Sequence, residues 1–266
     1  MKYGVCGLLT AKNADGTEFE LIPAAKLAGY DYIEMPLSAI AAMSEAEFAD
    51  LKAKAAAGGL PVEAMNVFFP RSLRLTGPDV DWKQVEAYLE LALGRAGQMG
   101  TQVVVFGSGG SRQVPEGFAM EDAWQQLVHL LRLAEPVAAR NGVTIVIEPL
   151  NDKETNILHT GSEGFTLAKL VDRPHIKLLL DLYHMALMHE DCGIAITAGD
   201  TVRHAHFAKP VGRSYPSEME PAFLAFFGGL KRGGYAARVS VEASFTNFAV
   251  DAPRTLAIMQ QAMEQG

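Results

Sequence analysis

The sequence has little of what marks several specialised classes of protein. It contains only two cysteines, Cys6 and Cys192, which are too few and too far apart for a disulfide framework. No Cys-x-x-Cys pair is present for zinc or redox chemistry, so we interpret both cysteines as plain thiols. No run of about 18 uncharged apolar residues occurs, as a membrane span requires. The first residues have no long apolar run or small-residue cleavage site, and we expect a cytoplasmic protein without a membrane partner.

Positive charge is also in short supply. The chain has 23 lysine and arginine residues against 31 aspartate and glutamate residues, a net charge of −8 at pH 7. Because a nucleic-acid partner requires a basic surface that neutralises phosphates, this balance predicts that the protein binds no nucleic acid. A local basic pocket for one small anion is still compatible with it. The 49% apolar content is that of an ordinary globular protein with a large core.

Short β-rich runs alternate with amphipathic segments along the whole chain. Several runs are rich in Val and Ile, as is typical of parallel strands covered on both faces. The predicted strands are Tyr3–Cys6, Tyr32–Met35, Val62–Val67, Gln102–Phe106, Thr144–Glu148, Lys177–Asp181, His204–Ala208 and Arg238–Glu242. The predicted helical segments include Glu18–Ala28, Glu45–Ala57, Trp82–Gln98, Ala123–Arg140 and Gly161–Val171. Glycine stands where a helix C-cap is expected, at Gly29, Gly58, Gly100 and Gly142.

Eight strands that alternate with helices predict parallel βαβ units, and eight is the number that closes a barrel. The alternative is an open doubly wound sheet, which usually carries a glycine-rich turn after its first strand. The first strand here runs into Gly7-Leu8-Leu9-Thr10, which is not such a turn. No linker or low-complexity stretch divides the chain. We therefore predict an α/β protein with a single domain, residues 1–266, folded as a (β/α)₈ TIM barrel.

Four successive predicted strands end in side chains that bind metals. Glu148 ends the fifth strand, Asp181 the sixth and Glu242 the eighth, and His206 lies near the end of the seventh. In a barrel, the carboxyl ends of the strands form the functional rim. Three carboxylates buried together are costly unless a cation compensates them. This oxygen-rich set predicts one divalent cation, Mn²⁺ first, with Mg²⁺, Co²⁺ or Zn²⁺ as alternatives.

Each of these residues also has an ordinary structural interpretation when it is taken alone. A strand-terminal carboxylate often caps a helix, and a buried histidine often belongs to the core. The pattern over four consecutive strands is much harder to explain in this way. His204 has the same parity as His206, so both side chains point to the same side of the strand. His204 is either a hydrogen-bond donor behind the metal site or a core residue.

Other strand ends provide candidates for a substrate pocket. The third strand leads into Asn66 and Phe68, and the fourth into the loop Gly107–Arg112, which includes Ser108. We predict that Asn66, Phe68 and Ser108 contact substrate, although core packing explains a phenylalanine equally well. The loop offers backbone N–H groups, hydroxyls and an arginine as a seat for a phosphate or a sugar hydroxyl. Glu34, at the end of the second strand, either lines the pocket or has a structural role.

The strand-end motifs resemble those of the xylose isomerase-like barrel superfamily. They read Ile147-Glu148-Pro149-Leu150-Asn151 with Glu154, Asp181-Leu182-Tyr183-His184-Met185, His204-Ala205-His206 and Ser240-Val241-Glu242-Ala243. Within the superfamily the chain is most similar to the ketose 3-epimerases, the tagatose and psicose 3-epimerase group. The resemblance covers nearly the whole chain and is best over residues 144–242. The motifs are specific as a set and weak singly.

This resemblance implies roles for individual residues. Glu148, Asp181, His206 and Glu242 match the metal ligands, and Glu148 and Glu242 also match the paired catalytic acid/bases. Glu154 and His184 match positions that bind substrate oxygens, and Arg213 resembles a substrate-binding arginine. Arg213 stands one residue later than expected for the epimerases, and the loop Phe207–Arg213 departs from theirs, which leaves the substrate open.

The implied reaction is metal-dependent proton transfer beside the carbonyl of a ketose or ketose phosphate. The metal binds the carbonyl and hydroxyl oxygens, and one glutamate removes a proton to give a metal-bound cis-enediolate. Return of a proton to the opposite face inverts the carbon, and return to the neighbouring carbon on the same face interconverts ketose and aldose. The resemblance also implies a homo-oligomer.

Five alternative functions stay open at this point. An inosose dehydratase, a hydroxypyruvate isomerase or a 2-keto-myo-inositol isomerase would use the same metal site, although hydroxypyruvate isomerases tend to carry glutamine in place of His206. An apurinic endonuclease would need further histidines at the ends of earlier strands, where this chain has Asn66 and Ser108. A non-catalytic sugar-binding protein would have no need of an intact pair of acidic residues.

Overall fold

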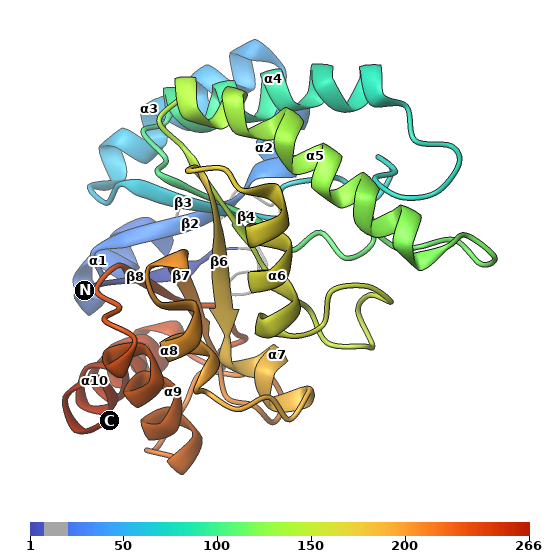
Figure 1. Ribbon diagram of the computed structural model, residues 1–266. Helices are drawn as coiled ribbons and strands as arrows, with labels where there is room; N and C mark the ends of the chain where they lie inside the picture. Colours follow the sequence, from blue (N-terminus) through green and yellow to red (C-terminus); the bar gives the residue numbers. More distant parts are fainter. Residues whose placement is uncertain (8–20) are drawn as a thin grey trace.

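Eight parallel strands close a barrel in the order of the chain (Figure 1). The structure is a computed structural model that describes residues 1–7 and 21–266. The strands are β1 (Lys2–Cys6), β2 (Tyr32–Pro36), β3 (Val62–Asn66), β4 (Val103–Phe106), β5 (Thr144–Ile147), β6 (Ile176–Asp181), β7 (Val202–Phe207) and β8 (Arg238–Val241). The predicted barrel is confirmed, and the predicted strand bounds differ from these by one or two residues. Most of the turn Gly7–Thr10 lies outside the described residues.

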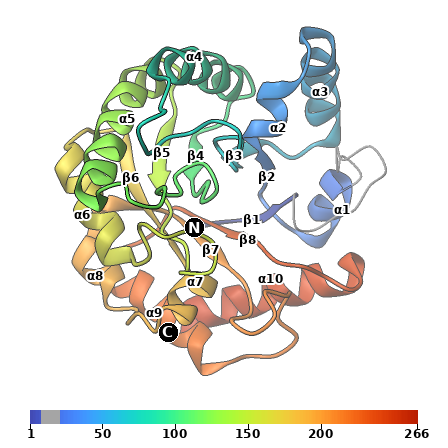
Figure 2. The ribbon, with the colours of Figure 1, turned by 90° about the vertical axis from the view of Figure 1, so that its right-hand side faces the viewer.

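The helices form a ring around the strands (Figure 2). They are α1 (Leu21–Ala28), α2 (Leu37–Ala42), α3 (Glu45–Gly58), α4 (Trp82–Gln98), α5 (Met120–Arg140), α6 (Gly161–Val171), α7 (Leu182–Leu187), α8 (Ile194–Ala198), α9 (Pro221–Arg232) and α10 (Phe248–Gln265), with a 3₁₀ turn at Gly199–Thr201. Of the predicted helix Glu18–Ala28, residues 18–20 lie outside the described part. None of the described helices has both the length and the apolar character that crossing a bilayer requires.

Local sequence signals fix several helix ends. Ser44 and Glu47 form a reciprocal capping box at the start of α3, because each side chain accepts a hydrogen bond from the other residue's backbone N–H. Helix α3 ends one residue later than predicted, since Gly58 is still helical and Gly59 adopts the left-handed conformation with φ of 80°. The expected C-cap glycine is therefore Gly59, and the prediction for Gly58 is wrong.

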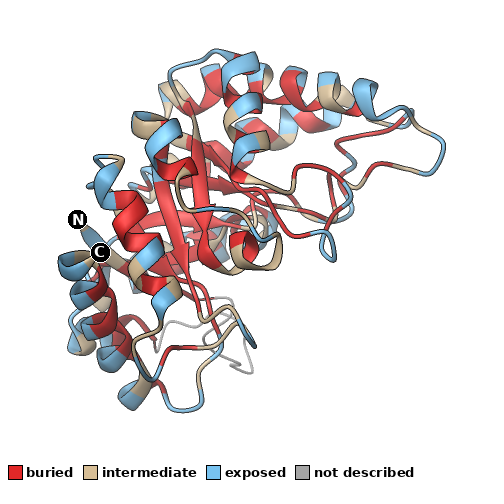
Figure 3. Ribbon diagram, turned by 60° about the horizontal axis from the view of Figure 1, so that its bottom comes forward, coloured by how far each residue is buried: buried red, intermediate tan, exposed pale blue. Residues whose placement is uncertain are grey.

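Side chains of the strands alternate between the barrel interior and the layer beneath the helices, and both layers are buried (Figure 3). A small apolar cluster fills the barrel: Tyr32, Ala64, Val103, Val105, Val146 and Leu179. The larger core lies between strands and helices. Because Asp181 is two residues after Leu179, and Glu148 two after Val146, both carboxylates point into the mouth of the barrel. The alternation of apolar side chains thus places polar groups on top of the interior cluster.

Gly4 of β1 shows how tightly this interior is packed. A Cβ atom at Gly4 would lie 2.4 Å from ring atoms of Tyr32, so only glycine leaves room for that ring. The Tyr32 hydroxyl in turn hydrogen-bonds the Ser240 hydroxyl at 2.7 Å. The floor beneath the rim is therefore a packed platform rather than a channel.

Candidate active site

The four predicted metal ligands converge at the C-terminal mouth of the barrel. Glu148, Asp181, His206 and Glu242 are all buried, and each offers one ligand atom within 4.8 Å of those of the other three. Asp181 and His206 are partners in the register of β6 and β7. Glu148 and Glu242 stand one residue beyond β5 and β8, where their backbone N–H groups still bond the carbonyls of Phe106 and Phe207. We refer to these four residues as the acidic cage.

The donor chemistry of the acidic cage fits a divalent cation. His206 Nδ1 lies 3.0 Å from both Glu148 Oε1 and Glu242 Oε2. Asp181 Oδ2 is buried and has no hydrogen-bond partner in the described part of the chain. A buried carboxylate oxygen without a donor is costly, and a metal ion would satisfy it. Three oxygen donors and one imidazole suit Mn²⁺, Mg²⁺, Co²⁺ or Zn²⁺.

The pKa shifts of the cage residues also fit a divalent cation. Burial raises the pKa of Asp181 to about 6 and also raises the pKa of Glu148. Burial acts on Glu242 too, but His206 and Arg213 outweigh it and hold the Glu242 pKa below its usual value. Burial opposes protonation of His206, yet Glu34 and Glu242 raise its pKa. Asp181, Glu148 and His206 thus hold protons more strongly than usual, and a divalent cation would compensate the buried charge in place of these protons.

Glu34 of β2 orients the imidazole of His206. His206 Nε2 lies 3.0 Å from Glu34 Oε1, and His204 Nε2 lies 2.8 Å from Glu34 Oε2. Ser240 donates a further hydrogen bond to Glu34 at 2.6 Å. With its Nε2 proton directed at Glu34, His206 would present the lone pair of Nδ1 to a cation that displaces the Nδ1 proton. Glu34 and His204 therefore both belong to the hydrogen-bond network behind the acidic cage. For Glu34 this is a structural role rather than a place in the pocket lining, and for His204 it is the role of a hydrogen-bond donor.

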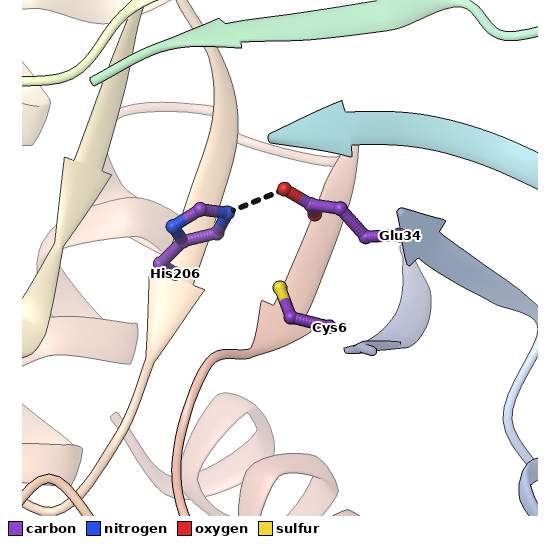
Figure 4. Close-up of side chains that lie close together, drawn as sticks. All are labelled: Cys6, Glu34 and His206. Atoms are coloured by element: carbon purple, nitrogen blue, oxygen red, sulfur yellow. Dashed lines mark hydrogen bonds and ion pairs between the residues drawn. The ribbon is translucent and has the colours of Figure 1, made fainter. Parts of the chain in front are cut away.

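Cys6 lies beside this pair (Figure 4). The figure shows Glu34 reaching from β2 to the ring of His206, with the sulfur of Cys6 next to both. Burial raises the pKa of the Cys6 thiol well above its ordinary value. Cys6 and Cys192 form no disulfide with each other.

A cavity of about 280 Å³ opens onto the acidic cage. Its lining includes Glu148, Glu242 and five of the predicted substrate contacts: Asn66, Ser108, Glu154, His184 and Arg213. Asn66 donates to Glu242 Oε1 at 3.0 Å. Arg213 Nη2 donates to Glu242 Oε2 at 2.6 Å and lies 3.5 Å from Asp181 Oδ2. These two donors hold the Glu242 carboxylate against the cavity.

His184 presents one ring nitrogen to the acidic cage. Its Nδ1 accepts the backbone N–H of Asn151 at 3.2 Å and faces the Asn151 side chain at 2.8 Å. The proton therefore belongs on Nε2, which lies 3.5 Å from Asp181 Oδ2 and has no close partner among the described residues. Burial lowers the pKa of His184, so the ring is neutral. It offers one N–H donor to an oxygen bound in the cage.

Two expectations about the pocket wall need correction. Phe68 is fully buried in the core and does not line the cavity, whereas Phe69 does. Core packing, the other interpretation of Phe68, is therefore the correct one, and the preceding Val67 has a left-handed backbone conformation with φ of 46°.

Arg112 is not available to a ligand either. It is fully buried, and its guanidinium donates to the carbonyls of Phe106, Glu148 and Leu158. The arginine of the glycine-rich loop thus holds the ends of β4 and β5 together. Another arginine, Arg71, lines the cavity, and its position outside the strand ends gave no signal in the sequence.

The fold and this site define a class of protein. The model of the xylose isomerase-like TIM barrel family matches residues 22–263. The chain belongs to this family.

Several individual proteins are similar to this chain in sequence or in structure. A probable ketose 3-epimerase of Synechocystis sp. is 28% identical over 252 residues, which cover 91% of this chain and 84% of that relative. An L-ribulose 3-epimerase of Methylomonas sp. is 34% identical over 140 residues, which cover 52% of this chain and only about half, 47%, of that relative. A D-allulose 3-epimerase of Methylomonas sp., crystallised with D-allulose, superposes with a TM-score of 0.86 at 23% identity, over 98% of this chain and 97% of that one. This last likeness supports the fold.

Proposed function

We propose that the protein is a divalent-metal-dependent sugar epimerase that acts on a ketose, with inversion at the carbon beside the carbonyl. The curated relatives named as ketose 3-epimerases favour this reaction and this substrate class. The observation that carries the proposal is the placement of Glu148 and Glu242. They follow β5 and β8, two walls of the barrel that are separated by β6 and β7, and both carboxylates reach His206 Nδ1 at 3.0 Å.

A substrate between these walls has one carboxylate on each face. Glu148, Asp181, His206 and Glu242 would hold the metal, which when bound supplies Lewis-acid polarisation of the substrate carbonyl. One glutamate takes the proton from the carbon next to the carbonyl, and the other delivers a proton to the opposite face. The two glutamates exchange these roles in the reverse reaction. The carbon is inverted because the two proton transfers occur on different faces.

The remaining wall residues position the sugar. His184 Nε2 donates a hydrogen bond to a substrate oxygen, while Arg213 and Glu154 flank the same region, with their closest atoms 3.6 Å apart. Arg213 packs over the ring of Tyr183, with 4.7 Å between the guanidinium carbon and the ring centroid, and this contact fixes its direction. Asn66 keeps Glu242 aligned through its amide. The apolar cluster below the cage closes the inner end of the site.

Solvent deuterium exchange tests this function. Purified protein supplied with Mn²⁺ or Co²⁺ is incubated in D₂O with a panel of ketoses, and NMR follows deuterium incorporation at the carbon beside the carbonyl. We expect incorporation together with formation of the epimer. Glu148→Gln and Glu242→Gln should each lower the rate by about 10³-fold, since each removes an acid/base group.

Glu86→Gln is the matched control, because Glu86 is an exposed glutamate on α4. It should retain the full rate. Exchange that persists in both active-site variants would refute the assignment of the catalytic pair. Deuterium at the neighbouring carbon, with aldose as product, would change the reaction to ketose–aldose isomerisation on the same site.

A further inference from the structure

The cavity has two chemically different ends. One end holds the acidic cage with Glu154, His184 and Arg213. The other end is formed by Arg71 and the loop Ser108–Ser111, and these residues include no acidic side chain. A substrate that spans the cavity therefore meets carboxylates at its reacting carbons and a single positive charge at its far end.

Gly107 and Gly110 of a single loop lie at the two different ends of the cavity, as their close contacts show. A Cβ on Gly107 would lie 2.2 Å from Glu148 Oε2, so this residue abuts the catalytic carboxylate. A Cβ on Gly110 would lie 2.5 Å from Arg71 Nε and 2.9 Å from its Cγ, so the Arg71 side chain rests on Gly110. Two residues lie between these glycines, so their Cα atoms are at most about 11 Å apart. A short sugar chain with a charged group at its terminal carbon fits within this limit.

Arg71 is held in this place by its neighbours. The backbone N–H of Phe69 donates to the Ser108 hydroxyl at 3.0 Å, and the Ser111 hydroxyl donates to the Pro70 carbonyl at 2.9 Å. On the other side, the N–H of Leu75 donates to the Ser111 carbonyl at 3.0 Å. The segment that carries Arg71 is thus tied to the glycine loop before and after the arginine.

The charge of Arg71 has no counterpart in the part of the chain that the structure describes. Its guanidinium makes no hydrogen bond or ion pair with residues 1–7 or 21–266, and the backbone N–H groups of Gly109 and Gly110 have no acceptor there. Arg213, the other arginine of the lining, is engaged by Glu242, Asp181 and Glu154. Arg71 is therefore the cation of this cavity that a ligand can pair with.

We propose that the far end of the cavity binds an anionic group, so that the substrate is a ketose with a phosphate or a carboxylate at its terminal carbon. This inference rests on the proposed function and names its substrate class. A guanidinium pairs with either anion through parallel N–H donors. Successive glycine N–H groups in a loop provide further donors at low steric cost.

The test uses matched substrates. In both the D-fructose and the D-tagatose series, kcat/KM from solvent deuterium exchange is measured with the Mn²⁺-loaded protein for the neutral ketose, its 6-phosphate and its 6-carboxylate. We expect at least one anion to exceed its neutral parent by about tenfold or more, as a charge-assisted hydrogen bond provides. Whichever anion is preferred identifies the group as phosphate or carboxylate.

Variants then test whether Arg71 causes the preference for an anionic substrate. Arg71→Gln should lower the ratio of anionic to neutral kcat/KM by about tenfold, and Arg71→Lys, which keeps the charge, should retain part of it. Arg74→Gln is the matched control, since Arg74 is an exposed arginine of the same segment that does not line the cavity. It should leave the ratio unchanged.

The outcomes separate the two proposals. Turnover that favours neutral ketoses, or an anionic preference that survives Arg71→Gln, overturns the inference and leaves the proposed function intact. Absence of exchange with every member of both series refutes the proposed function, and the inference with it.

Discussion

The two mouths of the barrel each bury glutamate, but they compensate its charge differently. At the N-terminal mouth, Glu63 near the start of β3 forms ion pairs with Lys2 of β1 and Arg238 of β8, and Arg238 Nε lies 2.6 Å from Glu63 Oε2. Burial raises the Glu63 pKa, but these two cations outweigh it and lower the pKa below its usual value. This end of the barrel is closed by charges that the chain itself supplies.

The C-terminal mouth has the opposite balance. Three carboxylates of the acidic cage converge there, and the only arginine in contact with them among the described residues is Arg213. Burial raises the pKa of Asp181 to about 6, as expected for a carboxylate without enough positive charge nearby. The comparison teaches that buried acid alone does not indicate a metal site. A metal site is indicated when the chain provides too few cations for its buried carboxylates.

Among changes outside the four cage residues, Glu34→Gln should have the largest effect on metal binding. A glutamine cannot accept protons from both His204 and His206 and also bond Ser240 as the carboxylate does, so His206 loses its fixed tautomer. We expect the Mn²⁺ affinity to fall about 10–100-fold, measured by isothermal titration calorimetry. The melting temperature of the metal-free variant shows whether the fold survives. An unchanged affinity would mean that Glu34 does not orient the ligand.

The next effect is the pH dependence of metal binding. The raised pKa of Asp181, about 6, means that Mn²⁺ must displace a proton from this carboxyl below that pH. Protonation of Asp181 should therefore lower the affinity by about tenfold per unit below pH 6. Glu148 and His206, whose pKa values are also raised, would steepen the fall. A flat affinity between pH 7 and pH 5 would contradict this prediction.

The smallest effect on metal binding is expected at the opposite mouth. Glu63→Gln leaves Lys2 and Arg238 without their partner and should lower the free energy of unfolding by about 1–3 kcal/mol. Because the acidic cage lies at the other end of the barrel, the Mn²⁺ affinity should not change. Urea denaturation and calorimetry measure the two quantities separately. A loss of metal affinity in this variant would show that the two mouths are coupled.

Local patterns sufficed to predict the barrel and the acidic cage. Short apolar runs located the strands, Asp181 and His206 stand at or near the ends of two of them, and parallel strands bring all carboxyl ends to one rim. The network behind the cage was beyond such patterns, because Glu34 meets His206 across the barrel, 172 residues apart in sequence.

The direction of side chains on loops was a second feature that could not be predicted from the sequence. Phe69 rather than Phe68 lines the cavity, next to a left-handed Val67 that no sequence periodicity encodes. Arg112 turned inward to backbone carbonyls, whereas Arg71, from another loop, reached the cavity. Side-chain direction in loops depends on long-range packing, so it could not be derived from the residue types alone.

A metal titration of the chelator-treated protein tests the central claim most directly. Mn²⁺ should bind at one ion per chain and raise the melting temperature, and Asp181→Asn should abolish the rise while the metal-free fold persists. A second bound ion would direct attention to Cys6, Glu34 and His206, which also form a set of metal donors. Failure of the folded protein to bind Mn²⁺, Mg²⁺, Co²⁺ or Zn²⁺ would contradict the account.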